Sequence, residues 1–326
     1  MRMTAAIVLR THGGPEVLTL EEVVVGAPGP GEVLIRQTAV GVNFHDCYVR
    51  SGLYRTLPLP GIPGIEAVGV VEALGPGVEG FQVGQRVGYV TGAYGGYAER
   101  RILPASVAVA LPDTLGDVAA ASLLLKGLTA CMLLRRVYAV KAGDTILVHA
   151  AAGGVGQLLC RWARHLGATV IGTAGSPGKA AIAREAGATE VIPYREGGFA
   201  DAVMSLTEGR GVDAVYDAVG RDTFAESLKS LAYCGALVNY GQASGPVEPV
   251  APAALGARSN SLSRPVVFHY LRDRASLEAM ATEVFAAVAG GVLRAETGLQ
   301  LPLAAAGEAH AALEARATTG AAVLIP

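Results

Sequence analysis

A glycine-rich segment in the middle of the chain has the residue types of a phosphate-binding turn. Residues 150–156 read Ala-Ala-Ala-Gly-Gly-Val-Gly, which matches the dinucleotide fingerprint with Ala151 in place of the first glycine. An apolar run of strand type precedes the segment and a helical pattern follows it, so N–H groups at the helix N-terminus would face a pyrophosphate. The residues expected at the cofactor are Gly153, Gly154, Val155 and Gly156. The alternative is a tight turn with a purely structural role.

The charges around this turn indicate which dinucleotide would bind. No Asp or Glu occurs between Asp144 and Glu185, although an NAD site usually has a carboxylate about 20 residues after the glycines. The expected second strand ends at Gly175 and Ser176, and Lys179 follows. A carboxylate would repel a 2′-phosphate, whereas a lysine and a hydroxyl would bind it. The sequence therefore favours NADPH over NADH, unless Lys179 is simply a solvated residue at a helix start.

The cysteines and histidines are not spaced as metal ligands. The four cysteines stand at positions 47, 131, 160 and 234 and form no CxxC pair. His45 lies near Cys47, but two ligands cannot complete a tetrahedral zinc site. We expect a metal-free protein with reduced thiols, which fits a reducing compartment such as the cytoplasm.

Composition excludes several classes of protein. The chain has 326 residues, of which 51% are hydrophobic and 17% charged, so it can bury a core and is not disordered. Its net charge of −2 without a basic cluster argues against nucleic-acid and membrane-surface partners. No signal-peptide pattern opens the chain, and its longest uncharged run, 230–247, contains amides, glycines and a proline, so we expect no membrane span.

The elements that must position these residues change in type along the chain. Short apolar runs between glycines and prolines predict an all-β, barrel-like unit over the first hundred residues. Helical patterns follow at 118–125 and 128–138, and strands and helices then alternate, which predicts a parallel, doubly wound sheet. The expected strands are 145–149, 168–172, 190–192, 213–217, 236–240 and 266–270, and the expected helices are 154–165, 179–185, 224–231 and 275–289.

Several segments, taken in order, resemble the quinone oxidoreductases related to zeta-crystallin, in the medium-chain dehydrogenase/reductase superfamily. The matching segments span nearly the whole chain: 41–54 (GVNFHDCYVRSGLY), 63–69, 126–129, 149–156, 216–223 and 316–320. The pattern is similar to bacterial NADPH:quinone reductases rather than to zinc alcohol dehydrogenases. Asn43 and Ile65 stand where the zinc enzymes carry a cysteine ligand and the histidine of a Gly-His-Glu motif.

The resemblance implies an α/β protein with a GroES-like β-barrel domain, a Rossmann domain and an active site in the cleft between them. On this basis residues 1–125 form the GroES-like catalytic domain and 126–263 the Rossmann NADPH-binding domain. Residues 264–326 then return to complete the first domain. The resemblance also implies a homodimer, with the strand expected at 266–270 as the edge of the Rossmann sheet.

The resemblance further implies roles for individual residues. Lys179, Tyr194 and Arg316 would hold the 2′-phosphate, with Gly175 and Ser176 beside them. The residues on the nicotinamide side would be Asn43, Lys126, Thr129, Tyr240 and Gly241. From the sequence itself, Tyr194 is equally an ordinary loop aromatic, and Lys126 is either a paired interior charge or a residue facing the cleft.

The expected activity is zinc-independent transfer of a hydride or electrons from NADPH to a quinone-like acceptor. Asn43, Tyr48 and Tyr54 are the catalytic candidates. Tyr48, Tyr54 and His45 either hydrogen-bond the acceptor oxygen or only line the site. One alternative is an NADPH-dependent reductase of enone or alkenal double bonds. Another is a non-enzymatic NADPH-binding structural or RNA-associated protein, which the net charge disfavours.

Overall fold

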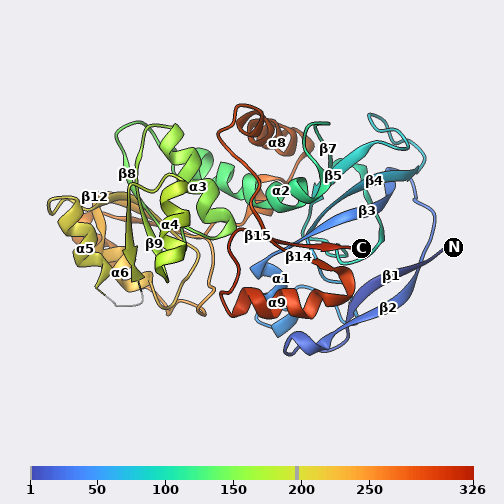
Figure 1. The fold of residues 1–326 in the computed structure, drawn as a ribbon, viewed down its shortest axis with the longest axis horizontal. Helices are drawn as coiled ribbons and strands as arrows, with labels where there is room; N and C mark the ends of the chain where they lie inside the picture. The colour runs from blue at the N-terminus through green and yellow to red at the C-terminus, as the bar shows by residue number, and fades with distance from the viewer. Residues whose placement is uncertain (1, 195–197) are drawn as a thin grey trace. The chain divides into compact units, whose positions relative to one another are not determined.

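The computed structural model describes residues 2–194 and 198–326 and divides into two units, each with its own main sheet (Figure 1). Unit 1 comprises Met1–Leu125, Leu271–Phe285 and Ala295–Pro326, and unit 2 comprises Lys126–Tyr270 and Ala286–Arg294. The chain therefore returns to unit 1 twice after it has left.

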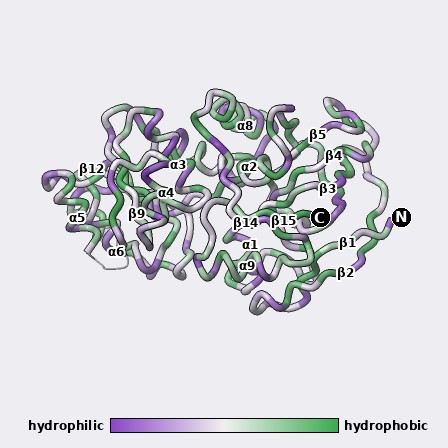
Figure 2. The backbone as a smooth tube through the Cα atoms, in the orientation of Figure 1, coloured by the Kyte–Doolittle hydropathy of each residue, from purple (hydrophilic) through white to green (hydrophobic). Residues whose placement is uncertain are grey.

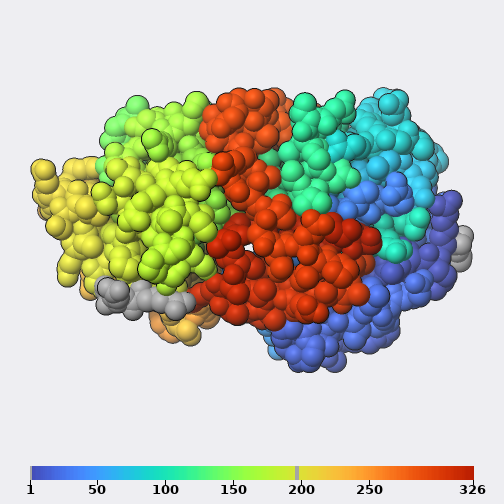
Figure 3. All heavy atoms as spheres, in the orientation of Figure 1, coloured from blue at the N-terminus to red at the C-terminus, as the bar shows by residue number. Residues whose placement is uncertain are grey.

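Unit 1 contains a seven-stranded sheet that the C-terminal residues complete. Its strands are β3 (Glu32–Val42), β4 (Glu66–Leu74), β5 (Arg86–Val90), β6 (Arg100–Pro104), β7 (Ala108–Ala110), β14 (Thr297–Pro302) and β15 (Ala321–Ile325). The order is β14-β15-β3-β4-β5-β7, and β6 pairs with β3. β15, drawn hydrophobic in Figure 2, runs antiparallel to β3 with Val323 opposite Gly41. In Figure 3 the last residues (red) adjoin the first strands (blue).

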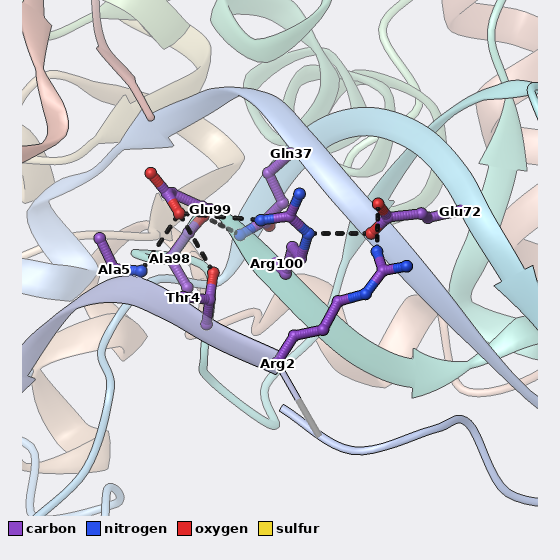
Figure 4. Close-up of polar contacts among 8 residues, drawn as sticks. All are labelled: Arg2, Thr4, Ala5, Gln37, Glu72, Ala98, Glu99 and Arg100. Carbon is purple, nitrogen blue, oxygen red and sulfur yellow. Dashed lines mark hydrogen bonds and ion pairs between the residues drawn. The ribbon is translucent and has the colours of Figure 1, made fainter. Parts of the chain in front are cut away.

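A separate ribbon of β1 (Arg2–Leu9) and β2 (Leu18–Val25) is joined to the segment before β6 by backbone hydrogen bonds, from the Glu99 N–H to the Ala5 carbonyl at 2.9 Å and from the Ile7 N–H to the Tyr97 carbonyl at 2.8 Å. Glu72 on β4 pairs with Arg2 at 2.8 Å and with Arg100 at 2.9 Å (Figure 4). The Thr4 hydroxyl donates to Glu99 at 3.3 Å. Such solvent-accessible pairs each contribute about 0–1 kcal/mol, so they add little to the attachment that the backbone bonds make.

Two helices of unit 1 were not expected from the sequence. α1 (Phe44–Ser51) follows β3 directly, and it ends at Gly52 with a left-handed φ of 82°. The Asn43 N–H at its start donates to the Asp46 carboxylate at 2.9 Å, as in a capping box. α9 (Ala306–Glu314) lies between β14 and β15 along the chain, in the returning segment where no helix was expected after 275–289.

Unit 2 has the doubly wound parallel sheet that the strand–helix alternation predicts. The strands are β8 (Thr145–Val148), β9 (Thr169–Ala174), β10 (Glu190–Pro193), β11 (Val212–Asp217), β12 (Leu231–Asn239) and β13 (Ser261–Ser263). The order β10-β9-β8-β11-β12-β13 reverses direction between β8 and β11, where sheets of this type bind ligands. The helices that follow the strands are α3 (Gly154–His165), α4 (Pro177–Glu185), α5 (Phe199–Leu206) and α6 (Phe224–Lys229). The predicted GroES-like and Rossmann-type fold class is confirmed.

The prediction of a strand at 266–270 is wrong. This segment contains the short helix α7 (Val267–Tyr270), and the sheet ends at β13, which pairs with β12. A short apolar run does not distinguish a strand from a helical turn. Pro265 before it has no N–H for a sheet ladder. α8 (Arg274–Ala289) follows close to its expected position.

The two helices expected at 118–138 form one helix, α2 (Asp117–Met132), which continues into a π-helical segment at Leu133–Val137. By length and composition the stretch Asp117–Val137 could cross a membrane, with a mean hydropathy of 1.6. However, 78% of its most apolar window is buried inside the protein. This burial is that of a core helix.

Candidate functional site

The glycine-rich turn after β8 packs backbone against backbone. Ala150 has a φ of 50°, and the Gly153 N–H donates to its carbonyl at 2.8 Å, which closes the turn before α3 begins. A Cβ on Gly156 would lie 2.3 Å from the Ala150 carbonyl oxygen and 2.9 Å from the Ala151 Cα. Only glycine therefore fits at position 156. The first N–H groups of α3 lie beyond intrahelical bonding, and this is the geometry that receives a pyrophosphate.

The end of β9 has hydroxyl and lysine residues where an NAD site has a carboxylate. Ser176 caps α4, and its hydroxyl accepts a hydrogen bond from the Lys179 N–H at 3.3 Å. Ser176 is exposed, and Gly175 and Lys179 are half-buried. This cradle suits the 2′-phosphate of NADPH, because no carboxylate of 145–184 is present to repel it.

A buried polar network lies beside the turn and joins three strand ends. The His149 ring is bonded through Nδ1 to the Thr173 hydroxyl at 3.0 Å and through Nε2 to the Ser227 hydroxyl at 2.8 Å. Ser227 donates to Asp217 at 3.3 Å. Burial lowers the pKa of His149, against the opposing effect of Asp217. The network fixes the ends of β8, β9 and β11, and it was not foreseen because its members are up to 78 residues apart.

The other predicted residues of unit 2 lie on β10, β12 and α2. Tyr194, just after β10, packs partly against the core of the parallel sheet. After β12, the Tyr240 N–H donates to the Asp217 carbonyl at 2.9 Å, and a Cβ on Gly241 would lie 2.6 Å from the Ala218 carbonyl oxygen.

Because the strands are parallel, the turn at 150–156 and the residues 175–179, 194 and 240–241 all lie at the same edge of the sheet. Lys126 and Thr129 stand three residues apart on α2 and so share one face. Lys126 is buried and Thr129 half-buried.

In unit 1, a buried carboxylate orients the predicted catalytic amide. The Asn43 Nδ2 donates to Glu66 Oε1 at 2.8 Å, and the Leu125 N–H donates to Oε2 of the same group at 2.8 Å. Glu66 is only 1% exposed. Sequence reasoning did not single out Glu66, although a charged residue that directly precedes the uncharged run 67–71 was a usable signal.

The predicted acceptor-side residues form an aromatic row along α1 and the segment after it. The Tyr48 and Tyr54 rings meet edge to face at 5.1 Å, and His45 meets Tyr54 edge to face at 5.5 Å. On its other side His45 stacks on Tyr94 at 5.9 Å. Burial lowers the pKa of His45 to about 4, so the ring is neutral at pH 7. Tyr94 was not predicted, since it lies in a glycine-rich loop without periodicity.

Arg316 belongs to unit 1, unlike the other candidate residues for the 2′-phosphate. It ends α9 in unit 1 with a φ of 55°, and its N–H donates to the Leu313 carbonyl at 2.9 Å. Lys179 and Tyr194 belong to unit 2.

No three His, Cys, Asp or Glu side chains within 2–194 and 198–326 are grouped as ligands of a metal ion. Cys47, Cys131 and Cys160 are buried as reduced thiols, and the thiol of Cys234 is exposed. Burial raises the pKa of Cys160 to about 12, which keeps it protonated. A groove of about 560 Å³ lies on unit 1 between Leu20 and the end of β14, but none of the predicted site residues lines it.

Comparison with known proteins places these features in a family. Residues 29–113 match the alcohol dehydrogenase GroES-like domain, and residues 154–283 match the family described as zinc-binding dehydrogenase. A quinone oxidoreductase of Pseudomonas aeruginosa is 45% identical over 99% of this chain and 100% of that protein. A 2-haloacrylate reductase of a Burkholderia species is 43% identical over 99% of both.

A solved structure agrees with these relatives. The crystal structure of Escherichia coli quinone oxidoreductase complexed with NADPH has a TM-score of 0.96 and 41% identity, covering 99% of this chain and 100% of that one. The match of sequence and fold runs through both units and the returning C-terminal segments. The chain belongs to the quinone oxidoreductases of the medium-chain dehydrogenase/reductase superfamily.

Proposed function

We propose that this protein is a zinc-independent NADPH:quinone oxidoreductase that passes a hydride or electrons to a quinone-like acceptor. The observation that carries the proposal is the carboxylate-free end of β9, where Ser176 and Lys179 begin α4 and would bind the 2′-phosphate. Family membership supports it, because the similar E. coli enzyme was crystallised with NADPH.

Each predicted residue receives a role in binding. The α3 turn, Gly153 to Gly156, binds the pyrophosphate through backbone N–H groups. The 2′-phosphate candidates are Gly175, Ser176, Lys179, Tyr194 and Arg316, and the nicotinamide-side candidates are Asn43, Lys126, Thr129, Tyr240 and Gly241. We propose that residues 1–125 form the catalytic domain and 126–263 the NADPH-binding domain. Residues 264–326 then return to complete the catalytic domain.

NADPH supplies the hydride when it is bound, and the chain supplies binding, orientation and hydrogen bonds. Glu66 holds the Asn43 amide at the start of α1. Tyr48, Tyr54 and neutral His45 are placed to bond an acceptor oxygen. A phenolate product is only modestly basic, so solvent suffices as its proton source.

Among residues 2–194 and 198–326, no His, Cys, Asp and Glu side chains are grouped as the zinc site that the matched family's description implies. The buried cysteines lie on three different helices, α1, α2 and α3. Ile65, next to Glu66, stands where the zinc enzymes would carry the histidine of their Gly-His-Glu motif. We therefore propose activity without a metal, and expect full turnover after treatment with a chelator.

The 2-haloacrylate reductase relative favours reduction of a conjugated double bond as a second candidate. A panel of 1,4-benzoquinone and 2-cyclohexenone, each with NADPH and with NADH, separates the two activities. We expect turnover of the quinone with NADPH. Turnover of the enone alone would establish the alternative, and a preference for NADH would contradict the proposed cofactor.

Replacing Lys179 tests the cofactor assignment directly. Loss of a charge-assisted bond costs about 1.5–3 kcal/mol, so Lys179→Ala should raise the KM for NADPH at least about tenfold. The KM for NADH, which lacks the 2′-phosphate, should stay unchanged. The matched control is Lys229→Ala, because Lys229 is exposed at the end of α6. Equal effects of the two substitutions on NADPH would refute the assignment.

We also propose a soluble, cytoplasmic homodimer. β13 is one of the two edge strands of the parallel sheet; Leu262 on this strand is 36% exposed, and Val266, three residues after it, is 40% exposed. Edge strands expose unpaired backbone groups that a second copy can cover. Light scattering after gel filtration should give twice the chain mass of 33.2 kDa.

A further inference from the structure

Tyr94 occupies a backbone conformation that few non-glycine residues adopt. Its φ is 45°, in the left-handed region, and Gly95 follows at 96°. The loop that contains it is fixed on both sides. The Thr91, Gly95 and Tyr97 N–H groups donate to carbonyls of residues 62–65 at 2.8–2.9 Å. Strain of this kind persists where the surroundings fix it, and it gathers at functional sites.

The strained backbone directs the Tyr94 side chain onto His45. The Tyr94 hydroxyl is hydrogen-bonded to His45 Nε2 at 3.0 Å and also to the Thr56 hydroxyl. The two rings are stacked with an interplanar angle of 28°. Tyr94 is 7% exposed, so it is a buried support and not a contact surface. Tyr94 thus contacts the His45 imidazole in two ways, by ring stacking and by a hydrogen bond to Nε2.

The imidazole continues into the acceptor-side row. His45 lies in the first turn of α1, two residues after Asn43, and its ring abuts Tyr54, which abuts Tyr48. A neutral imidazole has one N–H and one acceptor nitrogen, and its partner decides which nitrogen carries the proton. Burial keeps the pKa of His45 near 4, so this neutral form is the relevant one.

We propose that Tyr94 is a positioning residue: together with Thr56 it fixes the tautomer and the ring orientation of His45, and His45 so held selects acceptors by bonding their oxygen. The inference rests on the proposed function and deepens it. His45, Tyr54 and Tyr48 follow one another at ring distances of 5.1–5.5 Å. Such a row packs against a flat ring better than against a short open chain. Quinone turnover should therefore depend on Tyr94 more than turnover of a small enone.

The first test compares steady-state kinetics of Tyr94→Phe and Thr56→Val with the wild type. Both keep side-chain shape and remove a hydroxyl. We expect a rise of about fivefold to tenfold in the KM for 1,4-benzoquinone, with kcat within about twofold, as for one lost hydrogen bond. Thr56→Ser should behave as wild type, because it retains the hydroxyl. Tyr233→Phe is the control, since Tyr233 is 77% exposed on unit 2. Unchanged KM values in both variants would overturn the proposal.

The second test does not depend on turnover. Nitrogen-15 NMR of the histidine side chains, recorded with NADP⁺ bound, distinguishes the two imidazole tautomers. We expect a single tautomer of His45 in the wild type and in Thr56→Ser, and a mixture in Tyr94→Phe. A mixture already present in the wild type would refute positioning by Tyr94. If no quinone or enone is reduced at all, the proposed function fails, while this spectrum still decides the role of Tyr94.

Discussion

Gly156→Ala is expected to weaken both dinucleotide binding and the fold of unit 2. The added Cβ would lie 2.3 Å from the Ala150 carbonyl oxygen, 2.9 Å from the Ala151 Cα and 3.0 Å from the Ala150 carbonyl carbon. All three are backbone atoms, so relief requires the turn and α3 to separate by about 1 Å. Overpacking of this kind costs about 1–3 kcal/mol, which the better helix propensity of alanine offsets by up to about 1 kcal/mol.

The expected net loss is about 1–2 kcal/mol, or several degrees in melting temperature for a unit of this size. Binding should suffer more than folding, because the displaced turn carries the N–H groups proposed to meet the pyrophosphate. We expect the Kd for NADPH, measured by isothermal titration calorimetry, to rise at least about tenfold.

Gly256→Ala is the matched control for this experiment. Gly256 lies in the 3-10 helix Pro252–Arg258, near the start of β12 and away from the proposed nucleotide edge, and a Cβ there meets no atom within 4 Å. The control should bind NADPH as the wild type does and unfold at the same or a slightly higher temperature. The reasoning is refuted if Gly156→Ala matches the wild type in both Kd and melting temperature.

Three further predictions concern buried polar groups. Ser227→Ala removes a hydrogen-bond partner from buried His149, and we expect a loss of about 1–3 kcal/mol in urea denaturation. Tyr97→Phe removes a hydroxyl that donates to Asp46 at 3.1 Å and contacts His310 at 2.9 Å, with a similar expected loss. Burial, reinforced by a nearby arginine, lowers the pKa of His310 to about 3 from 6.5. Between these values only the unfolded state binds the proton, so His310 alone should lower stability by about 2 kcal/mol from pH 7 to pH 5, in addition to the loss that buried His45 contributes.

Each of these predictions has its own control. Ser205→Ala, at an exposed position of α5, should change stability by less than about 0.5 kcal/mol. For the acid effect, His310→Gln should reduce the loss of stability between pH 7 and pH 5 by about 2 kcal/mol, whatever its cost at pH 7, and should leave the part due to His45. An unaltered slope would assign the acid sensitivity to other groups, and an unchanged urea midpoint in Ser227→Ala or Tyr97→Phe would show that the lost bond is replaced.

The parallel sheet was predictable because its strands are buried on both faces and so appear as apolar runs, such as 145–148 and 169–174. The glycine turn followed from its position between such a run and a helix. α1 was missed, since eight residues of mixed type show little periodicity, although Asn43 and Asp46 form a capping signal.

The residues that orient the candidate site residues, such as Glu66 and Tyr94, could not be predicted from short stretches of sequence. Glu66 reaches Asn43 across 23 residues, and the ring of Tyr94 reaches His45 across 49. Such contacts arise from backbone pairing between distant segments, which no short window of sequence contains. The identity of a binding turn is therefore local information, whereas the orientation of the side chains around it depends on the tertiary fold.

The insertion of β15 between β14 and β3 has a consequence for synthesis on the ribosome. Residues 145–263, which contain every described strand of the parallel sheet, are translated before the five residues of β15. Until then Val40, Gly41 and Val42 of β3 lack the partners that β15 supplies on one side, while Val40 is already paired with Ala67 of β4 on the other. Nascent domains usually mature from the N-terminus, but here the second unit can mature first. A chain that stops near residue 320 would have a complete parallel sheet in unit 2, but β3 in unit 1 would expose an unpaired edge that is prone to aggregate. Cellular quality control would therefore recognise β3, near the start of the chain, although the missing residues are at its end.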